Sequence, residues 1–261
     1  MIRQSVGAAA TFAVGFAALV GAAACFPDFD KVQGGCKDCG SPDAALRRFC
    51  EKPLVAGEAR FCDDFDGRPI AEVWSSETRT GSSVLATDTA DAESPPRALR
   101  ARAAAGELAF VAASNLPSES KRWLHVSFSL RIDSGTETGG VLALRPEGPG
   151  GRSLKLMLAA DASRWHLDEV WPKDGGGAML AASHFVNVAL PTSAWVRVDV
   201  ALDVIDPKCT LRYGSARWDF DLETPFRAPS PRFELGLMSV SDGGAWDVHV
   251  DDVTYFFSDE N

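Results

Sequence analysis

Short runs of alternating apolar and polar residues follow one another along most of the chain, with glycine and proline between them. In 195–202, valine or leucine fills every second position, a period of two that is typical of a strand with one buried face. Patterns of helical period are scarce. The runs are Arg60–Phe65, Val84–Thr87, Ala98–Ala103, Leu108–Ala112, Trp123–Ile132, Val141–Arg145, Leu154–Ala159, Ser163–Leu167, Phe185–Leu190, Trp195–Ile205, Cys209–Tyr213, Ala216–Leu222, Arg232–Val240 and Trp246–Phe257. Their number and spacing predict an all-β fold of two packed antiparallel sheets.

The last run contains a change of phase. Trp246 and Val250 share one face of the run. Val253 and Phe257 must also face the core, but they lie an odd number of positions after Val250, so they are out of phase with it. The phase changes at Asp251-Asp252, which predicts a β-bulge there.

Four segments, in this order along the chain, resemble a known family. They are Phe61-Cys-Asp-Asp-Phe-Asp-Gly, Pro95-Pro-Arg-Ala-Leu-Arg, Trp195-Val-Arg-Val-Asp-Val and Val250-Asp-Asp-Val-Thr-Tyr-Phe. Together they resemble concanavalin A-like, laminin-G-type jelly-roll domains. The resemblance implies a two-sheet antiparallel β-sandwich whose first and last strands lie close together. In that family the concave sheet face often holds a glycan.

The start of the chain is typical of an export signal. Arg3 precedes an apolar stretch from Val6 to Val20, and three alanines precede Cys25. This pattern predicts a signal peptide at 1–24, and the residues before Cys25 resemble a bacterial lipobox, which implies lipidation at Cys25. An ordinary signal peptide cut nearby and an uncleaved membrane anchor are the alternatives. Phe26 favours the outer membrane over the inner one, so the prediction is an exported, cell-envelope lipoprotein held by an acyl anchor in the bilayer.

Residues 25–48 show no sustained period and predict a tether, with the sandwich domain at 49–261. Export implies an oxidising compartment, and Cys50 and Cys62 bracket a short loop, so they are the predicted disulfide. Cys36 and Cys39 are interpreted as a local disulfide, because a second pair of zinc ligands and a redox fold are both missing. Cys209 is either a buried thiol or the partner of a tether cysteine.

The charge and the motifs exclude several functions. A net charge of −10 argues against nucleic-acid binding. The acid pattern of the glucanases with this fold is missing, and the adjacent acids Asp168 and Glu169 would point to opposite faces of a strand. Only Tyr213 and Tyr255 could serve as a lyase tyrosine, and neither lies in a lyase motif. No catalytic residue is assigned.

Aspartates gather in the first and the last run, and the first and last strands are expected to adjoin. Oxygen ligands from both could hold a structural Ca²⁺, with Asp64 and Asp252 as the chosen ligands. The alternative, and the commoner arrangement, is that these acids are solvated at strand ends. No other cofactor is expected.

Trp171 is the candidate ligand-binding residue. It stands in the polar segment Val170–Gly177, where no core pattern requires a tryptophan, and Trp165-His166 lies one short strand earlier. An exposed indole beside polar groups suits stacking on a sugar, although a loop tryptophan can also cover the sandwich edge. The predicted function is therefore non-catalytic carbohydrate binding. A divergent polysaccharide lyase or glycoside hydrolase, or a structural envelope protein, are the alternatives.

Overall fold

The chain is described by a computed structural model in which residues 49–51, 59–116, 121–146, 153–159, 164–172, 179–186, 188–189, 192–223, 225–226, 231–259 and 261 are placed. Most of these residues belong to strands, and the helical segments are the short η2 (Phe49–Glu51) and α2 (Ile70–Val73). Among the placed residues, no helix is long and apolar enough to cross a membrane. The predicted tether and lipidation site lie outside them.

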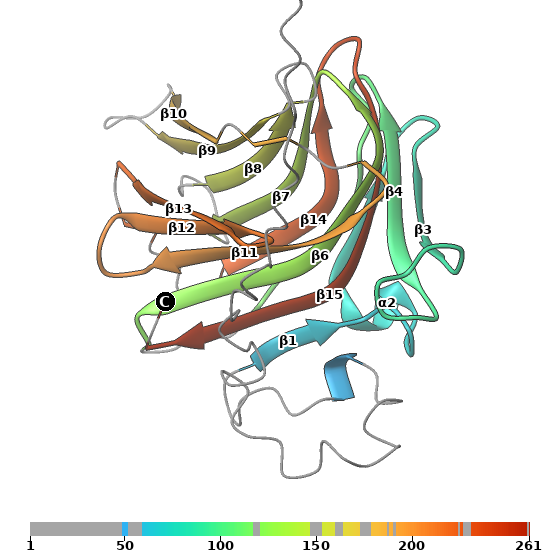
Figure 1. Cartoon of the computed structure of the whole chain (residues 1–261), viewed down its shortest axis with the longest axis horizontal. Coiled ribbons are helices and arrows are strands. Elements are labelled where there is room, and N and C mark those ends of the chain that lie inside the picture. Colours follow the sequence, from blue (N-terminus) through green and yellow to red (C-terminus); the bar gives the residue numbers. More distant parts are fainter. Residues whose placement is uncertain are drawn as a thin grey trace, which may run out of the picture. The chain divides into compact units, whose positions relative to one another are not determined.

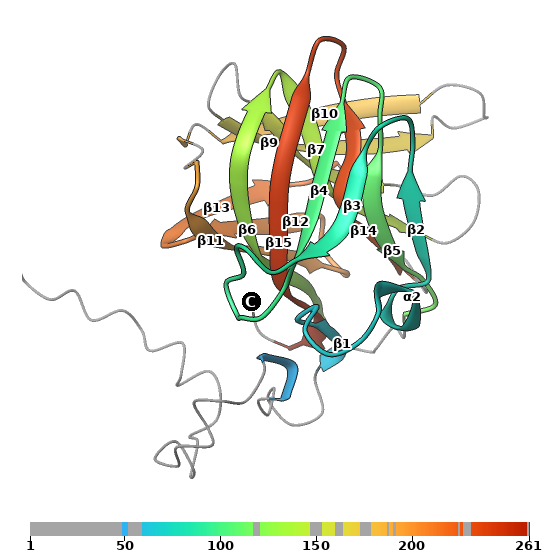
Figure 2. The same cartoon turned by 90° about the vertical axis from the view of Figure 1, so that its right-hand side faces the viewer.

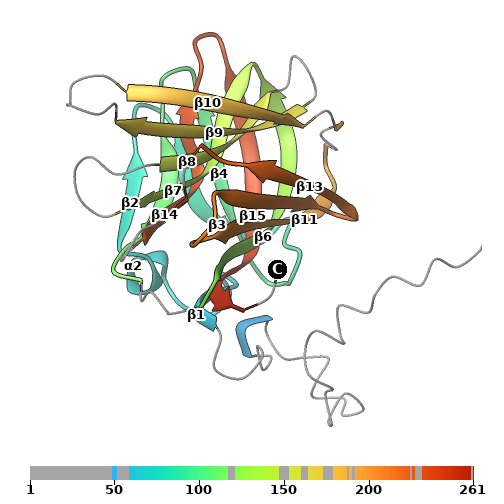
Figure 3. The same ribbon diagram turned by 90° about the vertical axis from the view of Figure 1, so that its left-hand side faces the viewer.

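The strands form two antiparallel sheets that pack face to face (Figure 1). Sheet A has the order β13 (Ala216–Asp221), β12 (Lys208–Tyr213), β11 (Trp195–Asp203), β6 (Trp123–Thr136), β15 (Ala245–Ser258), β4 (Ala98–Ala104) and β3 (Val84–Asp88), and β1 (Ala59–Asp63) also pairs with β15. Sheet B has the order β10 (Met179–Val186), β9 (Arg164–Pro172), β8 (Ser153–Ala159), β7 (Thr138–Pro146), β14 (Pro231–Val240), β5 (Ala109–Ala113) and β2 (Ser76–Arg79). Figure 2 shows β6, β15, β4 and β3 in front, and Figure 3 shows β10 and β9 at one edge of sheet B.

The period-two pattern decides which side chains enter the core. Val198, Val200 and Leu202 of β11 are buried between the sheets, as the alternation predicted. Each sheet therefore has an inner face of apolar residues and an outer face on which the intervening side chains lie.

The first and last strands lie side by side, as the family resemblance implied. β1 pairs with β15, and Cys62 lies opposite Thr254. The register of β15 against β6 shifts between Asp251 and Thr254, and Asp252 has a positive φ of 51°, which confirms the predicted bulge. The predicted disulfide is also confirmed, since Cys50 is bonded to Cys62 and joins η2 to β1.

Three sequence-based placements were wrong. The strand predicted at Phe185–Leu190 is β10, which spans Met179–Val186. Strand β9 continues to Pro172, so Trp171 lies in a strand opposite Leu180 of β10 and not in a loop. Strand β2 was not predicted, because its residues Ser-Glu-Thr-Arg carry no apolar alternation. Strand β2 is held by pairing to β5, which is distant in sequence, and β9 is extended by pairing to β8 and β10; a local pattern reports neither pairing.

Candidate functional site

The outer face of sheet B carries a row of side chains in register across five strands. Glu234 of β14 pairs with Ala143 of β7, which pairs with Lys155 of β8. Lys155 pairs with Asp168 of β9, which pairs with Ser183 of β10. The row is polar or charged on β14, β8, β9 and β10 and is interrupted by Ala143 on β7.

At the β10 edge, five side chains form a cluster that we call the β9–β10 patch: Arg164, His166, Asp168, Ser183 and Phe185. Ser183 Oγ donates to Asp168 Oδ1 at 2.6 Å, and His166 Nε2 lies 3.6 Å from Asp168 Oδ2. The Phe185 ring is 53% exposed, with the Arg164 guanidinium 4.5 Å from its centroid and the His166 ring 5.4 Å away. An exposed aromatic ring is thus surrounded by polar groups on a strand scaffold.

The electrostatics of the patch hold Asp168 ionised. Burial raises its pKa, but the nearby His166, the hydrogen bond from Ser183 and the charge of Lys155 outweigh burial and lower the pKa below its usual value. Asp168 is therefore suited to accept hydrogen bonds and not to donate a proton.

The structure separates the three residues predicted to bind a ligand. Trp165 is fully buried and packs against Tyr213 with ring centroids 4.8 Å apart, so its proposed role in stacking is wrong. Trp171 is half-buried and alternates with Leu167, on the inward-facing side of β9. His166 lies on the outer face, in the β9–β10 patch.

Among the placed residues, the outer face of sheet B carries two acids, Glu234 and Asp168, and they are too far apart to act as a hydrolytic pair. Three strand spacings separate Glu234 from Asp168, which is about 14 Å at the backbone. Glycosidase carboxyl groups lie roughly 5–10 Å apart. Glu234 is also held by two arginines, with Arg145 at 2.7 Å and Arg232 at 3.1 Å.

The two tyrosines do not reach this face either. Tyr213 and Tyr255 are both buried in the core between the sheets, and burial raises the pKa of both phenols. A lyase base needs a tyrosine that can contact substrate.

The acids predicted to bind calcium lie where the first and last strands adjoin. Asp64 accepts the backbone N–H groups of Cys50 and Asp66, and Asp252 accepts the Ser94 hydroxyl. Beside them Asp251 is fully buried, and its pKa is raised to about 8, chiefly by burial and also by the charges of neighbouring carboxylates. Arg197, whose guanidinium donates to the Asp252 carbonyl oxygen, offsets part of this negative charge, and calcium here stays a prediction.

No family model matches the sequence, and no curated protein matches it. Solved structures match in fold. An endo-β-1,4-glucuronan lyase from the fungus Trichoderma reesei has a TM-score of 0.59 at 11% identity, over 77% of this chain and 96% of that one. A GH16 protein of a Bacteroides ovatus mixed-linkage glucan PUL, in complex with a G4G4G3G product, has a TM-score of 0.53 at 13% identity, over 75% of this chain and 99% of that one. The chain is a jelly-roll β-sandwich.

The outer face of sheet A in this jelly roll is also rich in polar groups. His125 Nε2 lies 2.8 Å from Ser258 Oγ, and its Nδ1 lies 3.7 Å from Asp199 Oδ1. Ser258, His125 and Asp199 thus stand in the order of a nucleophile, a base and an acid. The 3.7 Å between His125 and Asp199 is too long for the hydrogen bond that would orient the ring. We assign no catalysis to this group.

A second group on sheet A has ligand geometry. Asp133, Asp247 and His249 bring one ligand atom each within 4.8 Å of one another, which no other three acidic, histidine or cysteine side chains do among the placed residues. Sequence reasoning gave Asp247 no more than a place in an acidic cluster and left His249 without a role.

Phe185 was likewise missed, because the strand that contains it was predicted too late in the chain. The sequence placed it at the start of a strand 185–190, whereas it lies near the end of β10. The alternation of Ala181, Ser183 and Phe185 on one side is visible in the sequence. The pairing with β9 decides that this side is the outer one.

Proposed function

We propose that this protein binds carbohydrate without cleaving it, and that the β9–β10 patch is the binding site. The observation that carries the proposal is the exposed ring of Phe185, held by Arg164 and His166 and flanked by Asp168 and Ser183. Sugar rings present apolar C–H faces that stack on aromatic rings and hydroxyl groups that need polar partners at their rims.

A sugar hydroxyl both donates and accepts hydrogen bonds, and the polar groups beside the Phe185 ring can pair with it in both ways. The ionised Asp168 accepts hydrogen bonds, and Lys155, directly opposite it on β8, donates them. Both side chains stand on paired strands, which fixes them before a ligand arrives. The two proteins of similar fold are described as a glucuronan lyase and a glucan-locus GH16 protein, and carbohydrate is therefore the ligand class we infer.

Binding without catalysis is favoured over the enzyme alternative. A retaining or inverting hydrolase needs two carboxyl groups on either side of the scissile bond, and a general acid needs a raised pKa. On this face Glu234 and Asp168 are widely separated, and the pKa of Asp168 is lowered. The buried tyrosines argue against a lyase in the same way.

We further propose that the domain is displayed on the cell envelope by a lipid on Cys25. The Cys50–Cys62 disulfide supports export, because disulfides persist in oxidising compartments. The alanine-rich leader before Cys25 supports the anchor.

A glycan array on the purified chain, followed by calorimetry on each hit, tests the site. Phe185→Ala should weaken binding at least tenfold, because stacking is lost. Ile205→Ala is the matched control, since Ile205 is 57% exposed and follows β11 of the other sheet. Equal affinity of Phe185→Ala and the unmodified protein would remove the site from the β9–β10 patch.

Every bound glycan is also incubated with the protein and assayed for new reducing ends and for unsaturated uronate products. Binding without either product is the expected result. Turnover that scales with protein concentration and survives repeated purification would contradict the non-catalytic assignment.

A further inference from the structure

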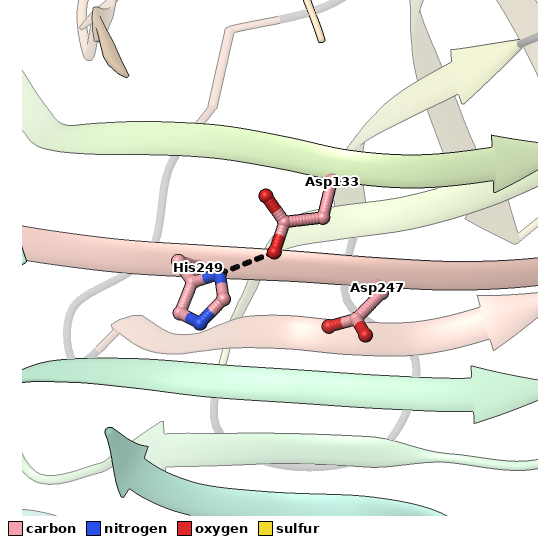
Figure 4. A group of neighbouring side chains, drawn as sticks. All are labelled: Asp133, Asp247 and His249. Carbon is pink, nitrogen blue, oxygen red and sulfur yellow. Dashed lines mark ion pairs between the residues drawn. The ribbon is translucent and has the colours of Figure 1, made fainter. Parts of the chain in front are cut away.

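Three potential metal ligands converge on the outer face of sheet A, the opposite side of the sandwich from the β9–β10 patch. Asp133 comes from β6, and Asp247 and His249 come from the neighbouring strand β15. Figure 4 shows both carboxylates turned toward the imidazole, with Asp133 nearest to it. His249 Nδ1 lies 3.1 Å from Asp133 Oδ2.

Strand alternation and a local bulge bring the three side chains together. Ile132 and Val248 point into the core, so Asp133, Asp247 and His249 point to the outer face. Asp247 pairs with Ser134 and Val248 pairs with Ile132, so Asp133 is an extra residue on β6 between two paired positions. Such a bulge re-aims a side chain.

The imidazole of His249 is buried without a hydrogen bond. It is 2% exposed, and both ring nitrogens lie out of contact with water and make no hydrogen bond. The Nδ1–Asp133 distance is short, but the geometry does not make a hydrogen bond. A buried polar group without a partner is costly, and a metal ion bound to Nδ1 would satisfy it.

The ion-paired side chains around these three ligands carry more negative than positive charge. Four acids take part in its ion pairs (Asp88, Asp91, Asp133 and Asp247), and two arginines oppose them. Arg100 holds Asp247 through two hydrogen bonds of 3.0 and 2.6 Å, and Arg131 holds Asp133 at 2.8 Å. With neutral His249 the sum is −2, which a divalent cation balances.

The surrounding contacts also have the form of an outer ligand shell. Asp88 Oδ2 lies 3.6 Å from His249 Nε2, on the other side of the ring, beyond hydrogen-bond distance, and would act through its charge on an imidazole that binds metal through Nδ1. Carboxylate oxygens have spare lone pairs, so Arg100 can keep its hydrogen bonds to Asp247 while a metal binds.

A cavity beside the group gives access. Its volume is about 530 Å³, and Asp247, Ser134, Arg102 and Glu107 are among its lining residues. An ion can therefore reach Asp247 from solvent, and water in the cavity can complete its coordination.

We propose that Asp133, Asp247 and His249 bind a divalent transition-metal ion of the Zn²⁺ class. One imidazole nitrogen and two carboxylate oxygens suit such an ion, whereas calcium takes six to eight oxygen ligands. Two atoms 3.1 Å apart subtend roughly 95° at an ion about 2.1 Å from each, an ordinary ligand angle. This site is separate from the predicted calcium position at Asp64 and Asp252.

The test uses the full chain, stripped with chelator and titrated with Zn²⁺ alone by calorimetry, with metal content measured after desalting. One ion per chain and a rise in melting temperature at saturation are expected. His249→Asn should weaken binding at least tenfold, and so should Asp133→Asn, which is partly exposed and provides the test should the first variant not fold. His125→Asn, which alters a buried histidine beside Asp199 on the same sheet, is the control and should bind Zn²⁺ as the unmodified chain does.

Cys36 and Cys39, when reduced, are competing zinc ligands, so Cys36→Ser/Cys39→Ser is titrated in parallel. Retained binding in this variant supports the sheet A site. The proposal is overturned if binding is lost with the cysteines, if His249→Asn and Asp133→Asn bind as tightly as the unmodified chain, or if Zn²⁺ does not bind at all.

Discussion

Gly236 of β14 should not tolerate a side chain, although alanine is otherwise ordinary in a strand. Its φ is +121°, a conformation that L residues rarely adopt. A Cβ atom there would lie 2.6 Å from the carbonyl oxygen of Ala109 and 3.0 Å from the Cα of Phe110, both backbone atoms of the paired strand β5. Because backbone atoms cannot rotate away, strands β14 and β5 would have to separate.

The cost of Gly236→Ala follows from two contributions. The unfavourable φ costs about 1–3 kcal/mol, and forcing an extra methyl group into packed atoms costs about 1–3 kcal/mol more. We expect a loss of about 4 kcal/mol in the free energy of unfolding. For a domain of this size that corresponds to a fall of roughly 8–16 °C in melting temperature.

Gly106→Ala is the matched control. Its φ of +72° is also positive, but nothing lies within 4 Å of the added Cβ, so only the conformational cost of about 1–2 kcal/mol applies. Equilibrium unfolding in guanidinium, with the disulfide intact, gives both values from the shift in midpoint at unchanged slope. A Gly236→Ala loss no larger than that of Gly106→Ala would refute the argument that backbone overlap decides the effect.

Four further outcomes are expected. Trp165→Ala should cost about 3–5 kcal/mol of stability by denaturant unfolding, since the indole is fully buried; a loss under 1 kcal/mol would contradict that burial. Asp203→Asn should cost about 2 kcal/mol of stability at pH 7. Arg122 and two backbone N–H groups outweigh burial and lower the pKa of this carboxyl in the folded protein. The loss should therefore shrink as pH falls below about 4, where the carboxylate is protonated first in the unfolded chain and then in the folded one. Cys25→Ala should abolish incorporation of labelled palmitate, and equal labelling would remove the lipid anchor. Millimolar calcium should raise the melting temperature of chelator-stripped protein and not that of Asp252→Asn, and no shift in either would dispose of calcium at that place.

The candidate site was only partly predictable from sequence. The alternation in 163–167 indicated a strand that presents His166, and His166 does lie on an outer face. The same alternation does not say which of the two sides is the core, so Trp165 was assigned to ligand binding although it packs between the sheets. Phe185 became recognisable as an exposed platform only once β10 was paired to β9.

Local chemistry also predicted the disulfide and the bulge in the last strand. Cys50 and Cys62 are close along the chain, and the change of hydrophobic phase at Asp251-Asp252 is a one-dimensional signal. The bulge at Asp133 left no such signal, because it follows from how β6 pairs with β15 more than a hundred residues later. The proposed metal group depends on that pairing.

By itself, then, the sequence determined the fold class, the alternation of buried and outward side chains, the disulfide and the expectation of an exported leader. These depend on side-chain period and on neighbours within about a dozen residues. Tertiary structure alone decided which faces are outermost, how far apart Glu234 and Asp168 stand, and that Asp133 meets His249. Those facts arise from strand order and register, which join residues far apart in the chain and which a period of two leaves undetermined.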